Sequence, residues 1–173
     1  MKKIITRFLM FSCLVVLIAG CAPKQEQISK TTVDFESPDW QVVSIASEDY
    51  GIVYEDIDDY RDYPLDKLVA YFLGSDGALA EGSGDELYNR FMEAPNTVLT
   101  YIALIGDGMA RDDIPVRTVL CREIAAADVF WYDATEAFGS ILQQYEEIYP
   151  SGRIADVLTC LKEEYDAAVE RNK

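Results

Sequence analysis

The sequence predicts an all-α protein of about six amphipathic helices, packed as antiparallel hairpins in a bundle or a short α-solenoid. Apolar residues recur at helical spacing in successive segments from residue 64 almost to the end of the 173-residue chain. Proline or a short polar residue precedes each segment, and glycine or proline closes several of them. The expected helices begin near residues 64, 83, 95, 114, 133 and 151, and connections this short favour antiparallel neighbours.

A polar loop separates the first two expected helices. The first begins at Pro64 and ends at Gly74. Its apolar residues fall at positions i, i+3, i+4, i+7 and i+8, which form one helical stripe: Leu65, Leu68, Val69, Phe72 and Leu73. We expect a loop over residues 75–82. The second helix should then begin at Ser83, because residues 83–86 have the spacing of a capping box.

The third expected helix is almost entirely apolar, and the fourth carries an apolar stripe. The third begins at Pro95 and ends at Gly106, and it has almost no polar face, so we expect it at the centre of the core. Asp113 is the expected cap of the fourth, which should continue toward Phe130 and Trp131. The residues of the fourth helix expected to face inward are Val116, Val119, Leu120 and Ile124.

The last two expected helices also follow capping residues. Asp133 begins a capping box with an acid in place of serine, and Ser151 caps the final helix after Pro150 has closed the fifth. The resulting layout of helical hairpins is similar in shape to HEAT-like α/α arrays, although no repeated sequence signature accompanies it.

The start of the chain has the pattern of an export signal. Three basic residues precede the apolar run over residues 8–18, which is shorter than the roughly 20 residues that cross a bilayer. The run ends in Leu17-Ile18-Ala19-Gly20-Cys21. This sequence resembles the lipobox of bacterial lipoproteins, in which the cysteine is lipidated and becomes the first residue.

The resemblance implies three parts: a signal peptide over residues 1–20, a lipidated Cys21 with a polar tether over residues 21–36, and one helical domain over residues 37–173. It also implies a membrane-anchored protein in the cell envelope. Ala22 follows the cysteine, which in lipoproteins of two-membrane bacteria favours the inner leaflet of the outer membrane. With a single membrane, the protein would face outward from the plasma membrane.

The mature chain is strongly acidic. The sequence has 15 basic and 31 acidic residues, and the leader removes three basic ones, which leaves 12 against 31, or −19. Such a surface disfavours nucleic acid and anionic lipid headgroups, and it favours a basic protein or a cation. We expect a short helix over residues 37–46 and a brief extended or packed segment over residues 52–54. The densest acidic residues form a candidate partner-binding surface: Glu48, Asp49, Glu55, Asp56, Asp58, Asp59 and Asp62.

The chain contains no histidine, which excludes Ser-His-Asp triads, Cys-His pairs and zinc sites that use histidine. The acids of the interhelical loops match no calcium-binding loop, so we interpret them as helix caps. We expect no metal, no cofactor and no enzymatic activity. Cys121 and Cys160 remain after the leader and the lipid site are set aside, either as free buried thiols or as a disulfide that export permits. A metal-binding or catalytic role is the remaining alternative for them.

Two further sets of residues have a structural and a functional interpretation. Arg90 and Arg117 lie within helical segments and should be paired structural arginines, with anion recognition as the alternative. Trp40, Trp131 and Tyr132 should pack in or beside the core, with a recognition face as the alternative.

We therefore expect a lipid-anchored helical interaction module that binds a protein partner, which the charge suggests is basic. A lipoprotein that binds a small ligand or a cation is the second hypothesis. An envelope hydrolase that uses a pair of carboxylates is the third, and it requires a cleft with two acids of different pKa.

Overall fold

The computed structural model of the protein describes residues 45–54, 59–110 and 113–173. The expected leader, Cys21 and the tether lie outside the described residues, as does most of the helix expected over residues 37–46. Ile45 and Ala46, the last two residues of that expected helix, are not helical.

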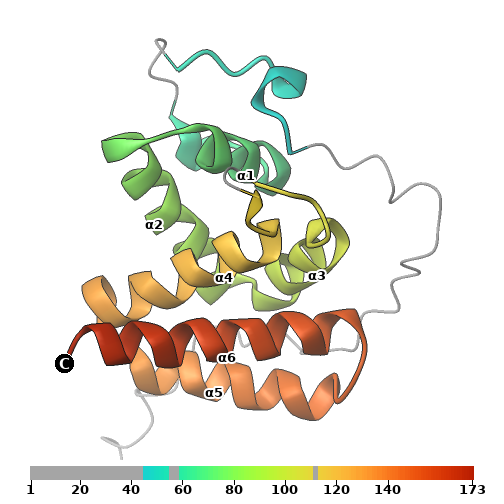
Figure 1. The fold of residues 1–173 in the computed structure, drawn as a ribbon, viewed down its shortest axis with the longest axis vertical. Coiled ribbons are helices and arrows are strands. Elements are labelled where there is room, and N and C mark those ends of the chain that lie inside the picture. The colour runs from blue at the N-terminus through green and yellow to red at the C-terminus, as the bar shows by residue number, and fades with distance from the viewer. Residues whose placement is uncertain (1–44, 55–58, 111–112) are drawn as a thin grey trace, which may run out of the picture.

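The described residues confirm the all-α prediction, because they contain six α-helices and no strand (Figure 1). Two 3₁₀ turns precede the helices, η3 (Ser47–Tyr50) and η4 (Tyr60–Asp62), and a π-helical turn, η6 (Asp128–Tyr132), follows α4. The α-helices are α1 (Leu65–Gly74), α2 (Gly77–Glu93), α3 (Pro95–Ile105), α4 (Val116–Ala127), α5 (Thr135–Ile148) and α6 (Arg153–Arg171). None of the helices described is long and apolar enough to cross a membrane.

The helices pack as successive hairpins around α4. Helices α5 and α6 lie side by side and are joined by a short turn, and α4 packs on α6 more extensively than any other helix pair (Figure 1). Helix α4 also contacts α2 and α3. Helix α3 buries Val98, Leu99 and Ile102 as expected and contacts α2, α4 and α6, so it lies in the core beside α4.

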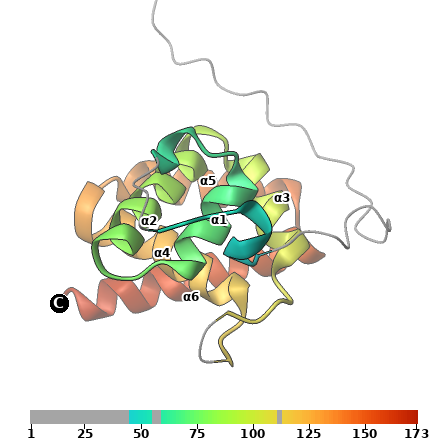
Figure 2. The ribbon, with the colours of Figure 1, turned by 90° about the horizontal axis from the view of Figure 1, so that it is seen from above.

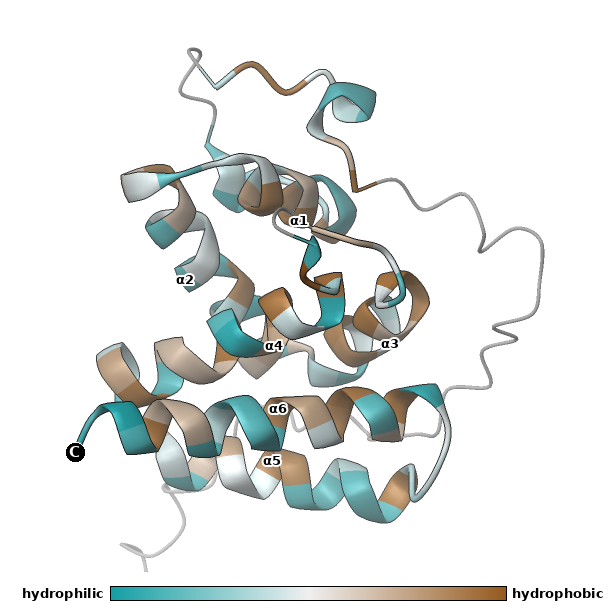
Figure 3. Cartoon of the chain, in the orientation of Figure 1, coloured by the Kyte–Doolittle hydropathy of each residue, from teal (hydrophilic) through white to brown (hydrophobic). Residues whose placement is uncertain are grey.

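Two apolar clusters hold the molecule together. The larger one joins all six helices, and its largest fully buried side chains include Phe91, Phe138 and Tyr145. The hydropathy colouring shows apolar residues on the facing sides of α3, α4 and α6 (Figure 3). A smaller cluster of Tyr63, Leu68 and Tyr71 lies under the segment that precedes α1.

The prediction for the start of α2 was wrong. Helix α2 begins at Gly77, so most of the expected loop over residues 75–82 is helical. Leu79 packs against the smaller apolar cluster, which stabilises this additional helical length. Ser83 is buried within the helix and donates its hydroxyl hydrogen bond to the Leu79 carbonyl at 2.7 Å, so it cannot cap a helix start.

Three expected caps are also absent, although α4, α5 and α6 begin within two residues of the expected positions. Pro115, Ala134 and Gly152 occupy the N-cap positions instead, and none of them accepts a side-chain hydrogen bond. Asp133 has a left-handed φ of 47° and ends the π-helical turn that precedes α5. Positive φ angles at Asp133 and at Gly152 (94°) turn the chain just before α5 and α6, in place of the side-chain caps that the sequence pattern predicted.

Candidate interaction surface

Three consecutive aromatic residues project from η6 and form what we call the aromatic segment: Phe130, Trp131 and Tyr132. Their side chains are 40%, 75% and 42% exposed. The prediction that the fourth helical segment runs toward Phe130 and Trp131 is confirmed, because η6 continues α4 directly to Tyr132. The prediction that Trp131 packs in or beside the core was wrong. The alternative, that these aromatic residues form a recognition face, is the one that the exposure favours.

The π-helical turn explains why the aromatic segment faces outward. In a continued α-helix, Trp131 would return to the side of Ile124 and Ala127, which are buried. Instead the chain closes a wider turn, in which the Asp133 N–H donates to the Asp128 carbonyl at 3.0 Å, five residues earlier. The wider turn delays the return to the core and leaves Trp131 in solvent. No pattern in the sequence signals this turn.

A buried hydrogen bond fixes the aromatic segment to the body of the protein. The Asp128 side chain is fully buried and accepts a hydrogen bond from the Tyr88 hydroxyl of α2 at 2.8 Å. The rings of Tyr88 and Tyr132 stack with their centroids 4.6 Å apart. One residue of α2 therefore holds both the first and the last residue of η6.

Burial shifts the pKa of both groups of this pair. It raises the pKa of the Asp128 carboxyl above its ordinary value, and the Tyr88 hydrogen bond opposes that rise. Burial and then the hydrogen bond to Asp128 raise the pKa of Tyr88. The second carboxyl oxygen of Asp128 is buried without a hydrogen-bond partner among the described residues. The Tyr88 hydroxyl is thus the partner on which this buried carboxyl depends.

Acidic side chains lie beside the aromatic segment. Asp133 follows it directly and Glu136 lies in the first turn of α5, and both are exposed. A cationic side chain that approached Trp131 would meet both an aromatic face and nearby carboxylates.

The acidic residues predicted from the sequence lie elsewhere. Glu48 and Asp49 are exposed on η3, which contacts α1, whereas η6 contacts α4, α5 and α6 (Figure 2). Asp59 and Asp62 flank or end η4 and are also exposed, and Asp59 forms an ion pair with Arg61 at 2.8 Å. The other three acids, Glu55, Asp56 and Asp58, lie outside the described residues.

Tyrosines hold this N-terminal acidic segment against the α1–α2 hairpin. The Tyr54 ring lies 5.2 Å from that of Tyr71, and its hydroxyl donates to the Tyr71 carbonyl at 3.2 Å. Gly74 and Gly82 allow the approach, because a Cβ there would lie 1.9 Å from the Tyr54 hydroxyl and 2.2 Å from the Tyr60 hydroxyl. The acidic surface is consequently fixed in place over residues 45–54 and 59–63.

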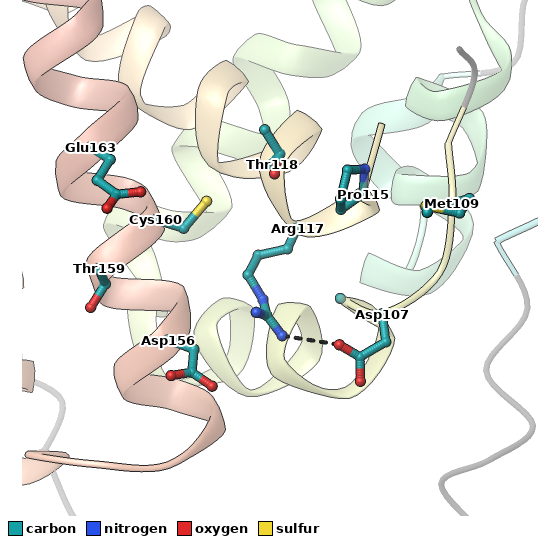
Figure 4. Close-up of a pocket in the computed structure, with 10 residues that line it drawn as sticks. Asp107, Met109, Pro115, Arg117, Thr118, Asp156, Thr159, Cys160 and Glu163 are labelled. Carbon is teal, nitrogen blue, oxygen red and sulfur yellow. Dashed lines mark hydrogen bonds and ion pairs between the residues drawn. The ribbon is translucent and has the colours of Figure 1, made fainter. Parts of the chain in front are cut away.

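A groove of about 540 Å³ separates the start of α4 from α6 (Figure 4). Arg117 and Asp107 lie on one side of it, and Asp156, Cys160 and Glu163 lie on the α6 side. Asp107 pairs with Arg117 at 3.4 Å and with Arg153 at 3.8 Å. Arg117 is therefore paired as the sequence predicted, and so is Arg90, whose guanidinium contacts Glu86 at 2.6 Å.

Cys121 on α4 and Cys160 on α6 are free thiols, and the Cys121 sulfur lies 3.8 Å from the Val157 carbonyl of α6. Cys121 is fully buried and Cys160 is half-buried in the wall of the groove. Each thiol shifts the pKa of the other, and their mutual interaction is the largest cause of the raised pKa of Cys121 and of the lowered pKa of Cys160. The sequence could name these residues but gave no sign that they would be neighbours.

Carboxyl groups also gather between α2 and α4. Burial, and then the charge of Glu81, raise the pKa of Asp85, while burial and then Asp85 and Glu81 raise that of Glu123. The Glu123 carboxyl lies against Gly84, where a Cβ would approach it to 2.1 Å. Within the described parts of the chain, no group of acids and cysteines has an arrangement suited to holding a metal ion.

No protein-family model, curated protein or solved structure matches the chain. The residues of the site are therefore what bears on function.

Proposed function

We propose that the protein is a lipid-anchored lipoprotein of the bacterial cell envelope whose acidic helical domain binds a basic protein partner through the aromatic segment. The observation that carries this proposal is the exposure of Phe130, Trp131 and Tyr132 on a turn that a buried hydrogen bond holds in place. Tryptophan and tyrosine are the residues that most often dominate the energy of protein interfaces. A fixed turn presents them with little loss of conformational entropy on binding.

Charge selects the class of partner. The mature chain carries −19 by count, and Asp133 and Glu136 lie next to the aromatic segment. Lysine or arginine of a partner could then contact the Trp131 face and these carboxylates together. The overall negative charge would also accelerate the encounter with a basic protein and repel anionic lipid headgroups.

Affinity capture from envelope extract and secreted material of the host tests the proposal. The full-length chain would carry a tag after Lys173, and capture would be compared at low and at physiological salt. We expect a basic protein that is retained at physiological salt, because buried aromatic contacts are not screened. Retention at low salt alone would contradict the proposal, since it would show only attraction to an acidic surface.

Two variants locate the contact. Trp131→Ala should abolish capture, whereas Met109→Ala, which removes another large side chain that is 61% exposed, should leave it unchanged. Equal capture by both variants would place the partner somewhere other than the aromatic segment.

The anchor has its own test, because a protein held by two or more acyl chains partitions stably into membranes. Cys21→Ser should move the protein from the detergent phase to the aqueous phase or leave it unprocessed. Membrane partitioning of a processed Cys21→Ser variant would contradict the lipid anchor.

The groove supports a second candidate function, the binding of a small ligand. Its volume of about 540 Å³ is within the usual range for small-molecule sites, and Arg117 offers a guanidinium at its wall. A ligand bound there should be lost in Arg117→Ala and retained in Trp131→Ala, which separates the two functions.

A further inference from the structure

The thiols of Cys121 and Cys160 form a pair that only the folded chain brings together. They are about 40 residues apart in the sequence, on α4 and α6, the two helices with the most extensive contact. The Cys121 sulfur lies 3.8 Å from the carbonyl of Val157, which is three residues before Cys160 on α6, and each thiol shifts the pKa of the other. Two thiols on facing turns of packed helices are candidates for a disulfide.

The surroundings of the two thiols are different. Cys121 is fully buried, whereas Cys160 lines the groove, where Figure 4 shows it beside Thr118 and across from Arg117. The interaction with Cys121 lowers the pKa of Cys160, with smaller help from Thr118 and Arg117 and with burial and Glu164 opposing. The pKa of Cys121 is raised by its interaction with Cys160 and by burial. The reachable thiol is thus also the one that ionises more readily.

We propose that Cys160 and Cys121 are a redox-active dithiol, in which Cys160 attacks a small disulfide that enters the groove and Cys121 resolves the product. This inference does not depend on the proposed function.

The reaction proceeds by two exchanges. The Cys160 thiolate attacks one sulfur of the external disulfide, a bond forms between them, and the external S–S bond breaks to release one thiolate. Cys121 then loses its proton to the solvent or to the leaving group, attacks the Cys160 sulfur and releases the second external thiol. The protein loses two electrons as its disulfide forms, and the external disulfide is reduced to two thiols.

The product would join α4 covalently to α6, because each helix carries one of the two sulfurs. Acidic residues at the α6 wall, Asp156 and Glu163, favour a disulfide that carries positive charge. Cystamine is a suitable probe because it is small and cationic.

The test exposes the purified full-length protein to cystamine under native conditions and identifies the products by mass spectrometry of the peptides that contain residues 121 and 160. This readout is independent of the state of Cys21. We expect the wild type to form the internal disulfide. Cys121→Ser should stop at a cystamine adduct on Cys160. Cys160→Ser should be modified by cystamine at least tenfold more slowly than Cys121→Ser. Each variant should react with cystamine at its remaining cysteine once it is unfolded in guanidinium. This control shows that the cystamine is active.

Two results would overturn the proposal. One is a folded wild type that forms no internal disulfide while the unfolded protein is modified by cystamine. The other is a Cys160→Ser variant that reacts as fast as Cys121→Ser, since Cys121 would then be as accessible as Cys160. A comparison of the circular dichroism spectra of both variants with that of the wild type excludes a general loss of fold as the cause.

Discussion

Removal of the Tyr88 hydroxyl tests how the aromatic segment is held. Tyr88→Phe keeps the ring that stacks on Tyr132 and deletes only the donor to Asp128. Asp128 is fully buried and its other carboxyl oxygen already lacks a partner among the described residues, so the substitution leaves the whole group without a protein hydrogen bond. A buried polar group left in this way costs about 1–3 kcal/mol, and hydrogen bonds to charged groups lie near the top of that range. We therefore expect a loss of about 2 kcal/mol.

Urea unfolding at pH 7, followed by far-ultraviolet circular dichroism, measures this loss as a lower midpoint with an unchanged slope. The chain provides a matched control in Tyr101, whose hydroxyl is buried without a hydrogen-bond partner in the part of the chain that the structure describes. Tyr101→Phe removes an unsatisfied group and should be neutral or stabilising. Equal losses in Tyr88→Phe and Tyr101→Phe, or no loss in Tyr88→Phe, would refute the role of the Asp128 hydrogen bond.

Three further predictions concern other parts of the fold. The pKa of Glu123 is raised by burial and then by Asp85 and Glu81, so its contribution to stability is complete below the unfolded pKa of about 4.3 and is lost as pH rises through the folded pKa. Glu123→Gln should therefore have a higher urea midpoint than the wild type at pH 7. A gain in midpoint that persists below pH 4 would contradict this cause. Oxidation of the thiol pair closes a loop of about 40 residues and should stabilise the protein by about 4 kcal/mol, seen as a higher urea midpoint that a reductant reverses; an unchanged midpoint would show strain in the oxidised form. Gly82→Ala places a methyl group against the Tyr60 hydroxyl, which should loosen the segment before α1 and speed its proteolytic cleavage. Equal cleavage rates of Gly82→Ala and the wild type would contradict this prediction.

The number and type of the helices could be predicted from the sequence because burial follows helical periodicity in every one of them. Leu68, Val69 and Phe72 of α1 are buried as their spacing indicated, and the same holds for Val116, Leu120 and Ile124 of α4. This agreement arises because the apolar stripe of each helix faces the shared core. Proline positions were equally informative, since α3 begins at Pro95 and α1 begins directly after Pro64.

The errors arose where a tertiary contact decided the local structure. The start of α2 was misplaced because Leu79 packs on the smaller apolar cluster, whose buried residues all lie outside α2. The exposure of Trp131 was missed because a π-helical turn changes the helical register after Asp128. That turn is held by Tyr88, which precedes Asp128 by 40 residues. The adjacency of Cys121 and Cys160 likewise depends on how α4 meets α6.

The proposed contact between the aromatic segment and a basic partner should determine the affinity of the captured partner at physiological salt. Isothermal titration would compare the wild type, Trp131→Ala and Met109→Ala. A central interface residue of this kind contributes at least about 2 kcal/mol, which corresponds to a Kd about 30-fold weaker. We predict this loss for Trp131→Ala and an unchanged Kd for Met109→Ala. An unchanged Kd for Trp131→Ala would contradict the proposed contact.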